Sequence, residues 1–377
     1  MKGLRPRVLI AYNTSRYVWI FRMPLLRALR VRGCEVVVLA PRDEYTDLII
    51  GAGIYFREIS LQARGKNPFQ ELLTAFAFLR AYREVRPDVV LHYTVKPNLY
   101  GSLAARILRI PVINNVTGLG AVFEQGGALQ AAVRLLYKIA FARVQRVFFQ
   151  NPDDLGSFVR GGLVESRRAG LLPGSGVDLE RFTPRPRDAG GDFIFLFIGR
   201  LLKAKGVEDL VRAAHVVKGK RPNIRVILLG KRDDNEHGAA DPRLLEEAAA
   251  ERWIELAGTT DDVRPFIAGS DCVVLPSFYR EGTPRSLLEA AAMGKPLIAA
   301  DSIGTREPVC DGENGFLCRP RDPDDLAAKM QAMLDLSAEA RARMGAASRR
   351  IAQERFDERI VTQKYMEIID RLVGTAR

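Results

Sequence analysis

Short apolar runs rich in β-branched residues alternate with longer stretches of helical spacing along almost the whole chain. The runs are nearly free of polar residues, so both faces of each corresponding strand would be buried. Strands of this kind, separated by helices, are typical of parallel sheets with helices on each side. The predicted strands are residues 7–12, 35–41, 88–93, 111–116, 146–151, 192–199, 224–230, 254–258, 272–277 and 296–300. The alternation therefore predicts an α/β fold.

One segment divides these strands into two sets. The stretch TPRPRDAGGD at residues 183–192 is rich in proline and glycine, which indicates an interdomain linker. We predict two doubly wound, Rossmann-like domains that face a cleft, with ligands at the carboxyl ends of the strands. The predicted domains are residues 1–186 and 187–355, followed by a C-terminal helix at 356–377 that packs back toward the first domain.

The charge of the chain is unevenly distributed. Residues 1–190 contain 28 Lys and Arg against 15 Asp and Glu, whereas residues 191–377 contain 29 against 30. Either the first domain meets an anionic surface or ligand, or the excess belongs to a solvated basic face. The beginning of the chain does not resemble a signal peptide, no apolar run is long enough to span a bilayer, and the four cysteines lack metal-ligand spacing. We expect a cytoplasmic protein without a metal site.

A pair of glutamates follows the strand CVVLPS. In SFYREGTPRSLLEAAAMGKPLIAAD, Thr283 suits a helix N-cap and Pro284 the first helical position. Glu281 would then lie in the loop and Glu289 inside the helix. The start of a helix attracts phosphate. Two carboxylates beside that position would not help to bind a phosphate, because both are negatively charged. The two glutamates are better suited to accept hydrogen bonds from hydroxyls, which a nucleotide sugar supplies on both of its rings.

A second motif, FIGRLLKAKGVEDL, ends the first strand of the predicted second domain. Arg200 and Lys205 follow the carboxyl end of that strand and precede a helix. Cationic side chains at this position can hold a diphosphate and stabilise its charge as a leaving group. Taken alone, the motif could equally be an exposed basic loop.

Together, GRLLKAKG and REGTPRSLLEAAAMGKPLIAAD resemble the retaining glycosyltransferases of the GT-B fold, in the large family four. The resemblance extends to residues 21–49, 95–105 and 114–123 and to the C-terminal tail, and so covers essentially the whole chain. These stretches are similar to the bacterial α-1,3-N-acetylgalactosaminyltransferases that build undecaprenyl-diphosphate-linked oligosaccharides. The resemblance implies transfer from a UDP-sugar to a polyprenyl-diphosphate-linked saccharide, without a cofactor or a catalytic metal.

The resemblance also implies roles for matching residues. Arg200 and Lys205 would bind the donor diphosphate, Glu281 the hydroxyls of the transferred sugar, and Glu289 the ribose. The three residues that follow Glu281 in the sequence, namely Gly282, Thr283 and Pro284, would contact the sugar and the phosphates. His92 ends a predicted strand in a region where the family often has a histidine on the donor sugar; it is either catalytic or structural. The predicted acceptor-binding residues are Asn13, Thr14, Ser15, Lys96, Asn98, Thr117 and Gly118. The first loop departs from the family, because YNTSRYVWIF lacks the glycine pair of many members.

The stretch at residues 126–147 mixes apolar and basic residues. We predict a basic amphipathic helix that holds the first domain on the cytoplasmic face of the inner membrane, a surface rich in anionic lipid. The predicted contacts are Arg134, Lys138, Arg143 and Arg146. The other interpretation is a core helix with a solvated basic edge.

Three other functions remain as alternatives. A non-hydrolysing UDP-sugar 2-epimerase shares the fold, but the two motifs argue against it. A hexosyltransferase of lipopolysaccharide or exopolysaccharide synthesis would use the same donor site with another acceptor. Charge alone would fit a nucleic-acid-binding protein, yet no recognised binding motif supports one, and we expect no nucleic-acid partner.

Overall fold

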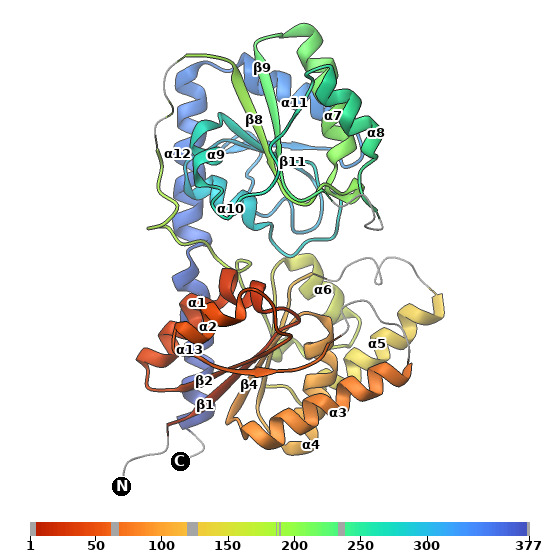
Figure 1. The fold of residues 1–377 in the computed structure, drawn as a ribbon, viewed down its shortest axis with the longest axis vertical. Coiled ribbons are helices and arrows are strands. Elements are labelled where there is room, and N and C mark those ends of the chain that lie inside the picture. Colours follow the sequence, from red (N-terminus) through yellow and green to blue (C-terminus); the bar gives the residue numbers. More distant parts are fainter. Residues whose placement is uncertain are drawn as a thin grey trace. The chain divides into compact units, whose positions relative to one another are not determined.

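The computed structural model describes residues 5–61, 68–118, 127–185, 187, 190–232 and 238–374. His237, which the sequence assigns to a polar loop, lies outside the described residues. The chain forms two compact units, one of Met1–Ser175 with Glu358–Arg377 and the other of Gly176–Asp357 (Figure 1). Each unit contains one parallel sheet with helices on both faces, as predicted.

The sheet of the first unit has the strand order β3-β2-β1-β4-β5-β6-β7. Its strands are β1 (Arg7–Ala11), β2 (Glu35–Ala40), β3 (Tyr55–Glu58), β4 (Val89–Tyr93), β5 (Val112–Val116), β6 (Arg146–Phe149) and β7 (Ala169–Leu171). Its helices are α1 (Ser15–Val31), α2 (Thr46–Gly51), α3 (Pro68–Val85), the π-helix η1 (Pro97–Gly101), α4 (Ser102–Leu108), α5 (Gly127–Phe141), α6 (Pro152–Arg160), the 3₁₀ turn η3 (Ser166–Arg168) and α13 (Glu358–Gly374).

Alternate residues of β1 enter two separate cores. Leu9 and Ala11 belong to a cluster with buried side chains of α3, α4, α5 and α6. Val8 and Ile10 belong to another, with buried residues of α1, α2 and α13. Because successive side chains of a strand point to opposite faces, the fully apolar strands require a helical layer on each side of the sheet.

The second sheet has the order β10-β9-β8-β11-β12-β13. Its strands are β8 (Phe193–Ile198), β9 (Ile224–Leu229), β10 (Glu255–Leu256), β11 (Cys272–Leu275), β12 (Leu297–Ala300) and β13 (Gly315–Cys318). Its helices are the 3₁₀ turn η4 (Lys203–Lys205), α7 (Val207–Lys220), α8 (Pro242–Ala250), α9 (Arg264–Gly269), α10 (Arg285–Ala292), α11 (Pro323–Asp335) and α12 (Ala338–Arg355).

Three strands of the structure have no counterpart among the predicted ones. They are β3, β7 and β13, and each lies at an edge of its sheet. An edge strand has a neighbour on one side only and is less fully buried; every residue of β3, for example, is at least partly exposed. Its sequence therefore lacks the continuous apolar run by which the central strands are identified.

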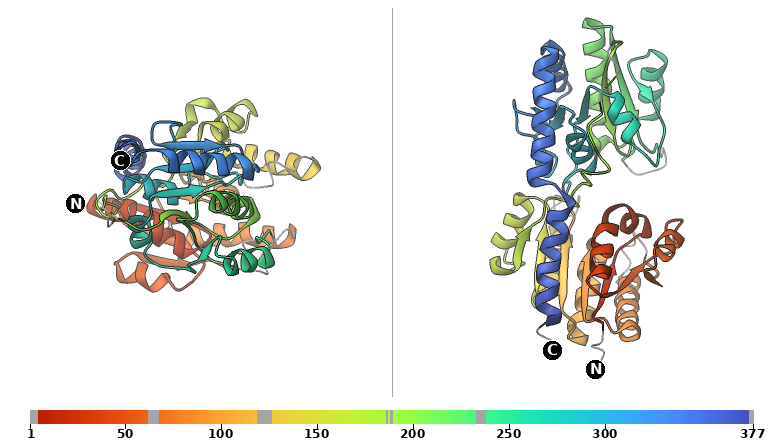
Figure 2. Two further views of the ribbon diagram at one scale, coloured as in Figure 1. Left: turned by 90° about the horizontal axis from the view of Figure 1, so that it is seen from above. Right: turned by 90° about the vertical axis from the view of Figure 1, so that its left-hand side faces the viewer.

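The division between the units falls after Ser175, earlier than the proline-rich segment at 183–192 suggests. Val177 and Phe182 are buried in the core of the second unit, and the Arg349 guanidinium donates to the carbonyl oxygen of Phe182 at 2.8 Å. At the other end of the chain, α13 belongs to the first unit (Figure 2). Its Tyr365 is buried, and the Tyr365 hydroxyl accepts a hydrogen bond from the side-chain amide of Asn115 at 2.9 Å. The C-terminal helix thus crosses back to the first unit, as predicted.

His92, a predicted catalytic residue, lies inside the core of the first unit. Its ring has no exposed surface; Nε2 lies 2.6 Å from the Tyr82 hydroxyl and Nδ1 2.8 Å from Oδ1 of Asn114. The backbone of η1 passes so close that a Cβ on Gly101 would lie 2.7 Å from Nε2. This enclosure favours the structural interpretation of His92 over the catalytic one.

Burial lowers the pKa of His92 to about 4, whereas a histidine in an unfolded chain titrates near ~6.5. The unfolded chain therefore takes up the proton first as the pH falls, and the stabilisation by neutral His92 is complete above about pH 6.5 and lost toward pH 4. We expect His92 to account for about 2 kcal/mol of the loss in free energy of unfolding between about pH 7 and pH 5. Urea unfolding of the first unit, followed by Trp19 fluorescence in a Trp253→Phe background, measures it.

The matched comparison is His92→Gln, which should be less stable than the parent at neutral pH but lose less stability on acidification. His215→Gln is the control, because His215 is exposed on α7 in the second unit. Equal acid dependence in the parent and in His92→Gln would contradict the assignment.

Candidate functional site

The strand order of the second sheet reverses between β8 and β11. The chain leaves β8 toward β9 on one side, while β11 pairs with β8 on the other side. In open parallel sheets, ligands bind outside the carboxyl ends of the strands at such a switch point. Both sequence motifs begin here, since GRLLKAKG follows β8 and SFYREG follows β11.

The loop after β8 packs tightly against the exit of β11. Gly206 has a left-handed backbone (φ +73°), and a Cβ there would lie 2.2 Å from the carbonyl oxygen of Pro276. The carbonyl oxygen of Ala204 accepts from the backbone amides of Phe278 at 3.0 Å and Tyr279 at 2.9 Å. Only glycine permits this approach, and the contact brings the two motifs together.

Lys205 and Glu281 form an ion pair across this junction. The side chains are only 16% and 14% exposed, respectively. The Lys205 ammonium and the Ser277 hydroxyl both donate to Oε1 of Glu281, the hydroxyl at 3.0 Å. The ammonium also lies 5.8 Å from the centre of the Tyr279 ring. The two residues that the sequence assigns to diphosphate and sugar are therefore in direct contact.

Helix α10 begins one residue later than predicted. Pro284, not Thr283, is its N-cap residue, and Arg285 is the first helical residue. No side chain caps this end, because proline lacks a hydrogen-bonding side chain. The helix ends as predicted before Gly294, whose backbone is left-handed (φ +71°).

Glu289 lies on α10 and pairs with Arg285 one turn earlier, with Arg285 Nε 2.8 Å from Oε1 of Glu289. Burial raises the pKa of Glu289, while the neighbouring charge of Arg285 and its hydrogen bond lower it. Arg200 is exposed just beyond the carboxyl end of β8. These residues and the Lys205–Glu281 pair belong to loops and a helix at the same edge of the second sheet.

The loop after β12 also contacts the two motif loops, although neither sequence motif includes it. Gly304 (φ +80°) lies so close to the loop after β11 that a Cβ would be 2.0 Å from the carbonyl oxygen of Gly282 and 2.4 Å from that of Glu281. The Ser302 hydroxyl donates to the carbonyl oxygen of Ser277. This loop therefore supports the backbone of Glu281 and Gly282. A glycine soon after a predicted strand, in DSIGT, was the only available signal.

A second switch point lies between β1 and β4 in the first sheet. Asn13 follows shortly after the end of β1, and Thr94 follows directly after the end of β4. The rings of the residues before them, Tyr12 and Tyr93, stack with their centres 5.2 Å apart. Thr94 has the left-handed backbone (φ +68°) that is rare outside glycine. Asn13, a predicted acceptor residue, thus follows β1 at the same edge of the sheet where β4 leads into Lys96 and the π-helix η1, which carries Asn98.

The other predicted acceptor residues differ in their surroundings. The hydroxyls of Thr14 and Ser15 serve the start of α1, where Thr14 donates to Oδ2 of Asp43 at 2.7 Å and Ser15 to the carbonyl oxygen of Pro41 at 2.8 Å. Lys96 pairs with Oε1 of Glu71 at 2.8 Å. Thr117 and Gly118 are half-buried after β5.

Unpartnered polar atoms gather around this first switch point. Within the described part of the chain, eight buried side-chain atoms have no hydrogen-bond partner, and six of them surround the ends of β1 and β4. These six are Asn13 Oδ1, Arg22 Nε, Glu71 Oε2, the Tyr93 hydroxyl, Thr94 Oγ1 and Asn98 Oδ1. Buried polar groups are normally bonded, so such a concentration is unusual.

The predicted basic helix at 126–147 is too long. Helix α5 ends at Phe141, so Arg134 and Lys138 lie on it but Arg143 and Arg146 do not. Arg146 is the first residue of β6, and its guanidinium donates to the carbonyl oxygen of Arg167 at 3.0 Å. Burial lowers the pKa of Arg146. Four basic residues on one helix face are therefore not present.

In the residues that the structure describes, no helix is long and apolar enough to cross a membrane. In the same residues, no three His, Cys, Asp or Glu side chains gather as a set of metal ligands.

Known proteins resemble both halves of the chain. The family described as glycosyl transferases group 1 matches residues 180–351, and the family described as glycosyl transferase 4-like matches residues 7–151. The N,N'-diacetylbacillosaminyl-diphospho-undecaprenol alpha-1,3-N-acetylgalactosaminyltransferase of Campylobacter jejuni is 28% identical, over 94% of this chain and 96% of that protein. A D-inositol 3-phosphate glycosyltransferase of Geodermatophilus obscurus is 30% identical, over 87% of this chain and 81% of that protein.

Solved structures agree on the fold. Anabaena HepE in complex with UDP superimposes with a TM-score of 0.80 at 20% identity, covering 97% of this chain and 100% of that one. A glycosyltransferase of Rickettsia africae gives a TM-score of 0.79 at 17% identity, covering 98% and 99% of the two chains. From the two family matches, the full-length relatives and the two parallel sheets, the chain belongs to the group 1, family-four-like glycosyltransferases of the GT-B fold.

Proposed function

We propose that the protein transfers a hexose, N-acetylgalactosamine as the first candidate, from a UDP-sugar to a polyprenyl-diphosphate-linked saccharide. The observation that supports a UDP-sugar donor is the Lys205–Glu281 pair at the switch point of the second sheet. The Campylobacter relative supports a polyprenyl-diphosphate-linked acceptor, because it matches nearly the whole chain and is named for transfer to such a lipid. The protein would work on the cytoplasmic face of the inner membrane.

The ion pair suits a donor that carries both a diphosphate and hydroxyls. A diphosphate offers Lys205 more negative charge than one carboxylate does, and it would draw the ammonium away from Glu281. Glu281 would then be free to accept hydrogen bonds from the hydroxyls of the sugar, while Ser277 keeps its carboxylate in place. Arg200, exposed at the end of β8, would add a second cation to the diphosphate.

The other residues predicted to contact the donor lie at the same edge of the second sheet, at the carboxyl ends of its strands. The backbone of Gly282 and Thr283, supported by Gly304, would contact the sugar and phosphates beside Pro284 at the start of α10. Glu289 would accept from the ribose hydroxyls, for which Arg285 holds its carboxylate in place. No cofactor is needed in this scheme, because Arg200 and Lys205 supply the positive charge that the leaving UDP requires.

The unpartnered atoms of the first sheet support a saccharide acceptor. Five of the six are oxygens, of Asn13, Glu71, Tyr93, Thr94 and Asn98, and each can accept hydrogen bonds. Sugar hydroxyls are donors, and satisfying a buried acceptor recovers its desolvation cost. We therefore propose that the sugar next to the lipid diphosphate binds at the ends of β1 and β4, near Lys96.

We propose transfer with retention of configuration. The bond between C1 of the donor sugar and the β-phosphate oxygen breaks, and the acceptor hydroxyl oxygen bonds to C1 on the same face. Its proton passes to the phosphate oxygen of the departing UDP. Arg200 and Lys205 stabilise the negative charge that grows there, and the step requires no metal.

The experiment incubates the protein with UDP-N-acetylgalactosamine and a polyprenyl-diphosphate saccharide, and analyses the product by mass spectrometry and NMR. A lipid product heavier by one sugar with an α linkage, together with free UDP, is expected. Conversion of the donor to its 2-epimer without transfer would support the epimerase alternative instead. Transfer only to a lipopolysaccharide or exopolysaccharide precursor would replace the proposed acceptor.

Lys205→Ala and Arg200→Ala should each lower turnover by about 10²–10³, because each removes a cation from the leaving diphosphate. The control is Lys203→Ala, since Lys203 lies in the same turn but points to Glu208, with 3.5 Å between Nζ and Oε1. Steady-state kinetics with saturating acceptor measure the effect. Full turnover in both site variants would remove these residues from the mechanism.

Glu281→Ala should mainly change the turnover rate, and Glu289→Ala should mainly change the affinity for the donor. Glu289 would meet the ribose, which does not react, so its loss should weaken donor binding with a smaller effect on turnover. Glu281 would meet the sugar that moves, so its loss should mainly lower turnover. Calorimetric UDP-sugar binding and single-turnover rates separate the two. The assignment is reversed if Glu281→Ala abolishes binding while Glu289→Ala changes nothing.

Asn13→Ala should raise the KM for the acceptor by roughly tenfold, which corresponds to one lost hydrogen bond. It should leave the melting temperature unchanged, because Asn13 Oδ1 makes no hydrogen bond within the described protein. Glu44→Ala, an exposed neighbour beyond β2, is the control. An unchanged acceptor KM would show that the unpartnered oxygen does not meet the acceptor.

A further inference from the structure

The exposed apolar side chains are concentrated in the first unit. Among the residues that the structure describes, Val216 and Leu256 are the only large exposed apolar side chains of the second unit; all others belong to the first. The basic excess lies in the same half of the sequence. Contiguous exposed apolar surface marks an interaction site, and basic surroundings select an anionic partner.

Helix α3 carries the densest of these exposed groups. Phe78 and Tyr82 are fully buried against the sheet. On the outer side, Leu72, Leu73 and Phe76 are 54%, 52% and 58% exposed, respectively. The outer side of an amphipathic helix is normally polar. The outer face of the first half of this helix is therefore apolar, where a polar surface is the normal arrangement.

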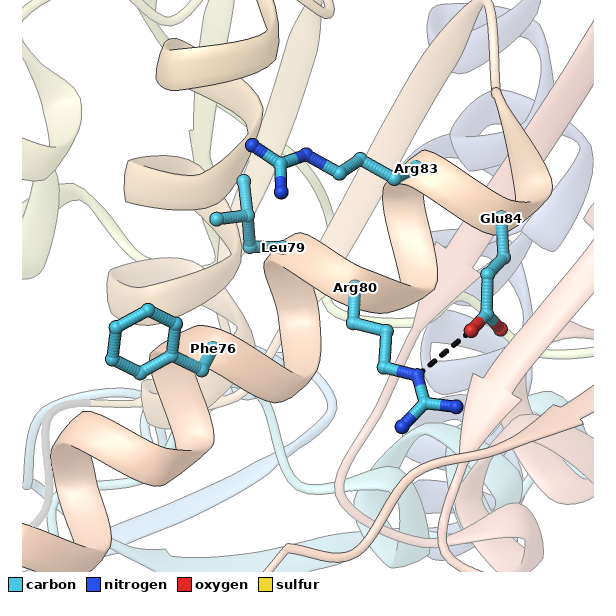
Figure 3. Close-up of a pocket in the computed structure, with 5 residues that line it drawn as sticks. All are labelled: Phe76, Leu79, Arg80, Arg83 and Glu84. Atoms are coloured by element: carbon cyan, nitrogen blue, oxygen red, sulfur yellow. Dashed lines mark hydrogen bonds and ion pairs between the residues drawn. The ribbon is translucent and has the colours of Figure 1, made fainter.

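The outer face becomes charged in the second half of α3 (Figure 3). Phe76 and Leu79 line a hollow together with Arg80, Arg83 and Glu84. The Arg80 guanidinium is held by Glu84, with Nε 2.8 Å from Oε1. An apolar stretch thus runs directly into a cationic one along a single helix.

Two neighbouring helices have the same character. Ile107 on α4 and Leu135 and Ile139 on α5 are exposed. The Arg106 guanidinium of α4 donates to the carbonyl oxygen of Ile139 at 3.2 Å, which joins the ends of the two helices. Helices α3, α4 and α5 cover the same face of the first sheet (Figure 1). We call their outer surface the α3–α5 face.

The charges of the α3–α5 face are nearly all positive. The described parts of α4 and α5 contain no carboxylate, and the two carboxylates of α3 are both paired. Glu71 pairs with Lys96, and Glu84 with Arg57 and Arg80. The basic residues of the three helices are Arg80, Arg83, Arg106, Arg134 and Lys138. Basic residues beside exposed apolar ones fit the interface of an anionic bilayer.

We propose that the α3–α5 face docks on an anionic lipid bilayer, with Leu72, Leu73 and Phe76 inserted at the level of the acyl chains. The basic side chains of the three helices lie against the lipid headgroups. The contact thus centres on α3, and not on the stretch at 126–147 that the sequence indicates. Its purpose rests on the proposed function, because docking brings the protein to a lipid-linked acceptor. The docking itself is tested without donor or acceptor, so the two proposals fail separately.

The first experiment measures flotation of the full chain with vesicles of phosphatidylethanolamine and phosphatidylglycerol. The variant Leu72→Ser/Leu73→Ser/Phe76→Ser should bind roughly tenfold more weakly. The matched control is Val31→Ser/Ile50→Ser/Tyr55→Ser, three exposed apolar residues elsewhere in the first unit. This control should bind like the parent. An equal loss in both triple variants, or in neither, overturns the proposal.

The second experiment tests charge. Parent binding should fall as salt rises above about 0.1 M, where the Debye length is near ~10 Å. Arg83→Ser/Lys138→Ser should weaken binding to anionic vesicles and leave the weak binding to phosphatidylcholine vesicles unchanged. Equal parental binding to anionic and neutral vesicles, or none to either, contradicts the inference.

The third experiment reports insertion directly. Phe76→Trp fluorescence should shift to the blue and become protected from aqueous quenchers when anionic vesicles are added, whereas Tyr55→Trp should not change. The α3 triple variant should keep transfer to a short water-soluble acceptor, which shows that it folds. If that variant instead dissociates a dimer in sedimentation without affecting vesicle binding, the face belongs to a second copy of the chain and the proposal is wrong.

Discussion

The contact between Gly206 and the carbonyl of Pro276 determines the geometry of the candidate donor site. It joins the loop that leaves β8 to the loop that leaves β11, at the point where the strand order of the second sheet reverses. Lys205 and Glu281 stand on these two loops and form an ion pair across the junction. A third loop supports the same backbone through the approach of Gly304 to Gly282. The site is thus built from backbone contacts that only glycine permits, and the functional side chains follow from them.

The pairing of Lys205 with Glu281 balances two opposite charges that are largely shielded from water. Two opposite charges shielded from water are tolerated because each partners the other, and breaking the pair is favourable only when a stronger partner arrives. Under the proposed function, a diphosphate with attached sugar hydroxyls would replace both halves of the pair at once. The oxygens of Asn13 and Asn98 represent the opposite arrangement, because they are buried without a hydrogen-bond partner within the described protein, and under the proposed function the acceptor would supply one.

The sequence alone predicts the central strands and the donor motifs, but not the edges or the burial of single residues. The central strands are apolar on both faces, whereas β3 is an edge strand with no buried residue and carries no such signal. The start of α10 differs by one residue because Pro284 fits both the N-cap and the first helical position. The role of His92 could not be read from the sequence, since its enclosure depends on Tyr82, Asn114 and the close passage of Gly101. Likewise, Arg146 follows apparent helical spacing but begins a strand.

The most direct test of the account is a crystal structure of the protein with UDP-sugar. We expect the diphosphate at the carboxyl ends of β8 and β11, with Lys205 Nζ within about 2.7–3.2 Å of a phosphate oxygen and no longer paired with Glu281. Glu281 should then contact a hydroxyl of the donor hexose. A donor bound elsewhere, with the Lys205–Glu281 pair intact, would contradict the proposed site and the mechanism that follows from it.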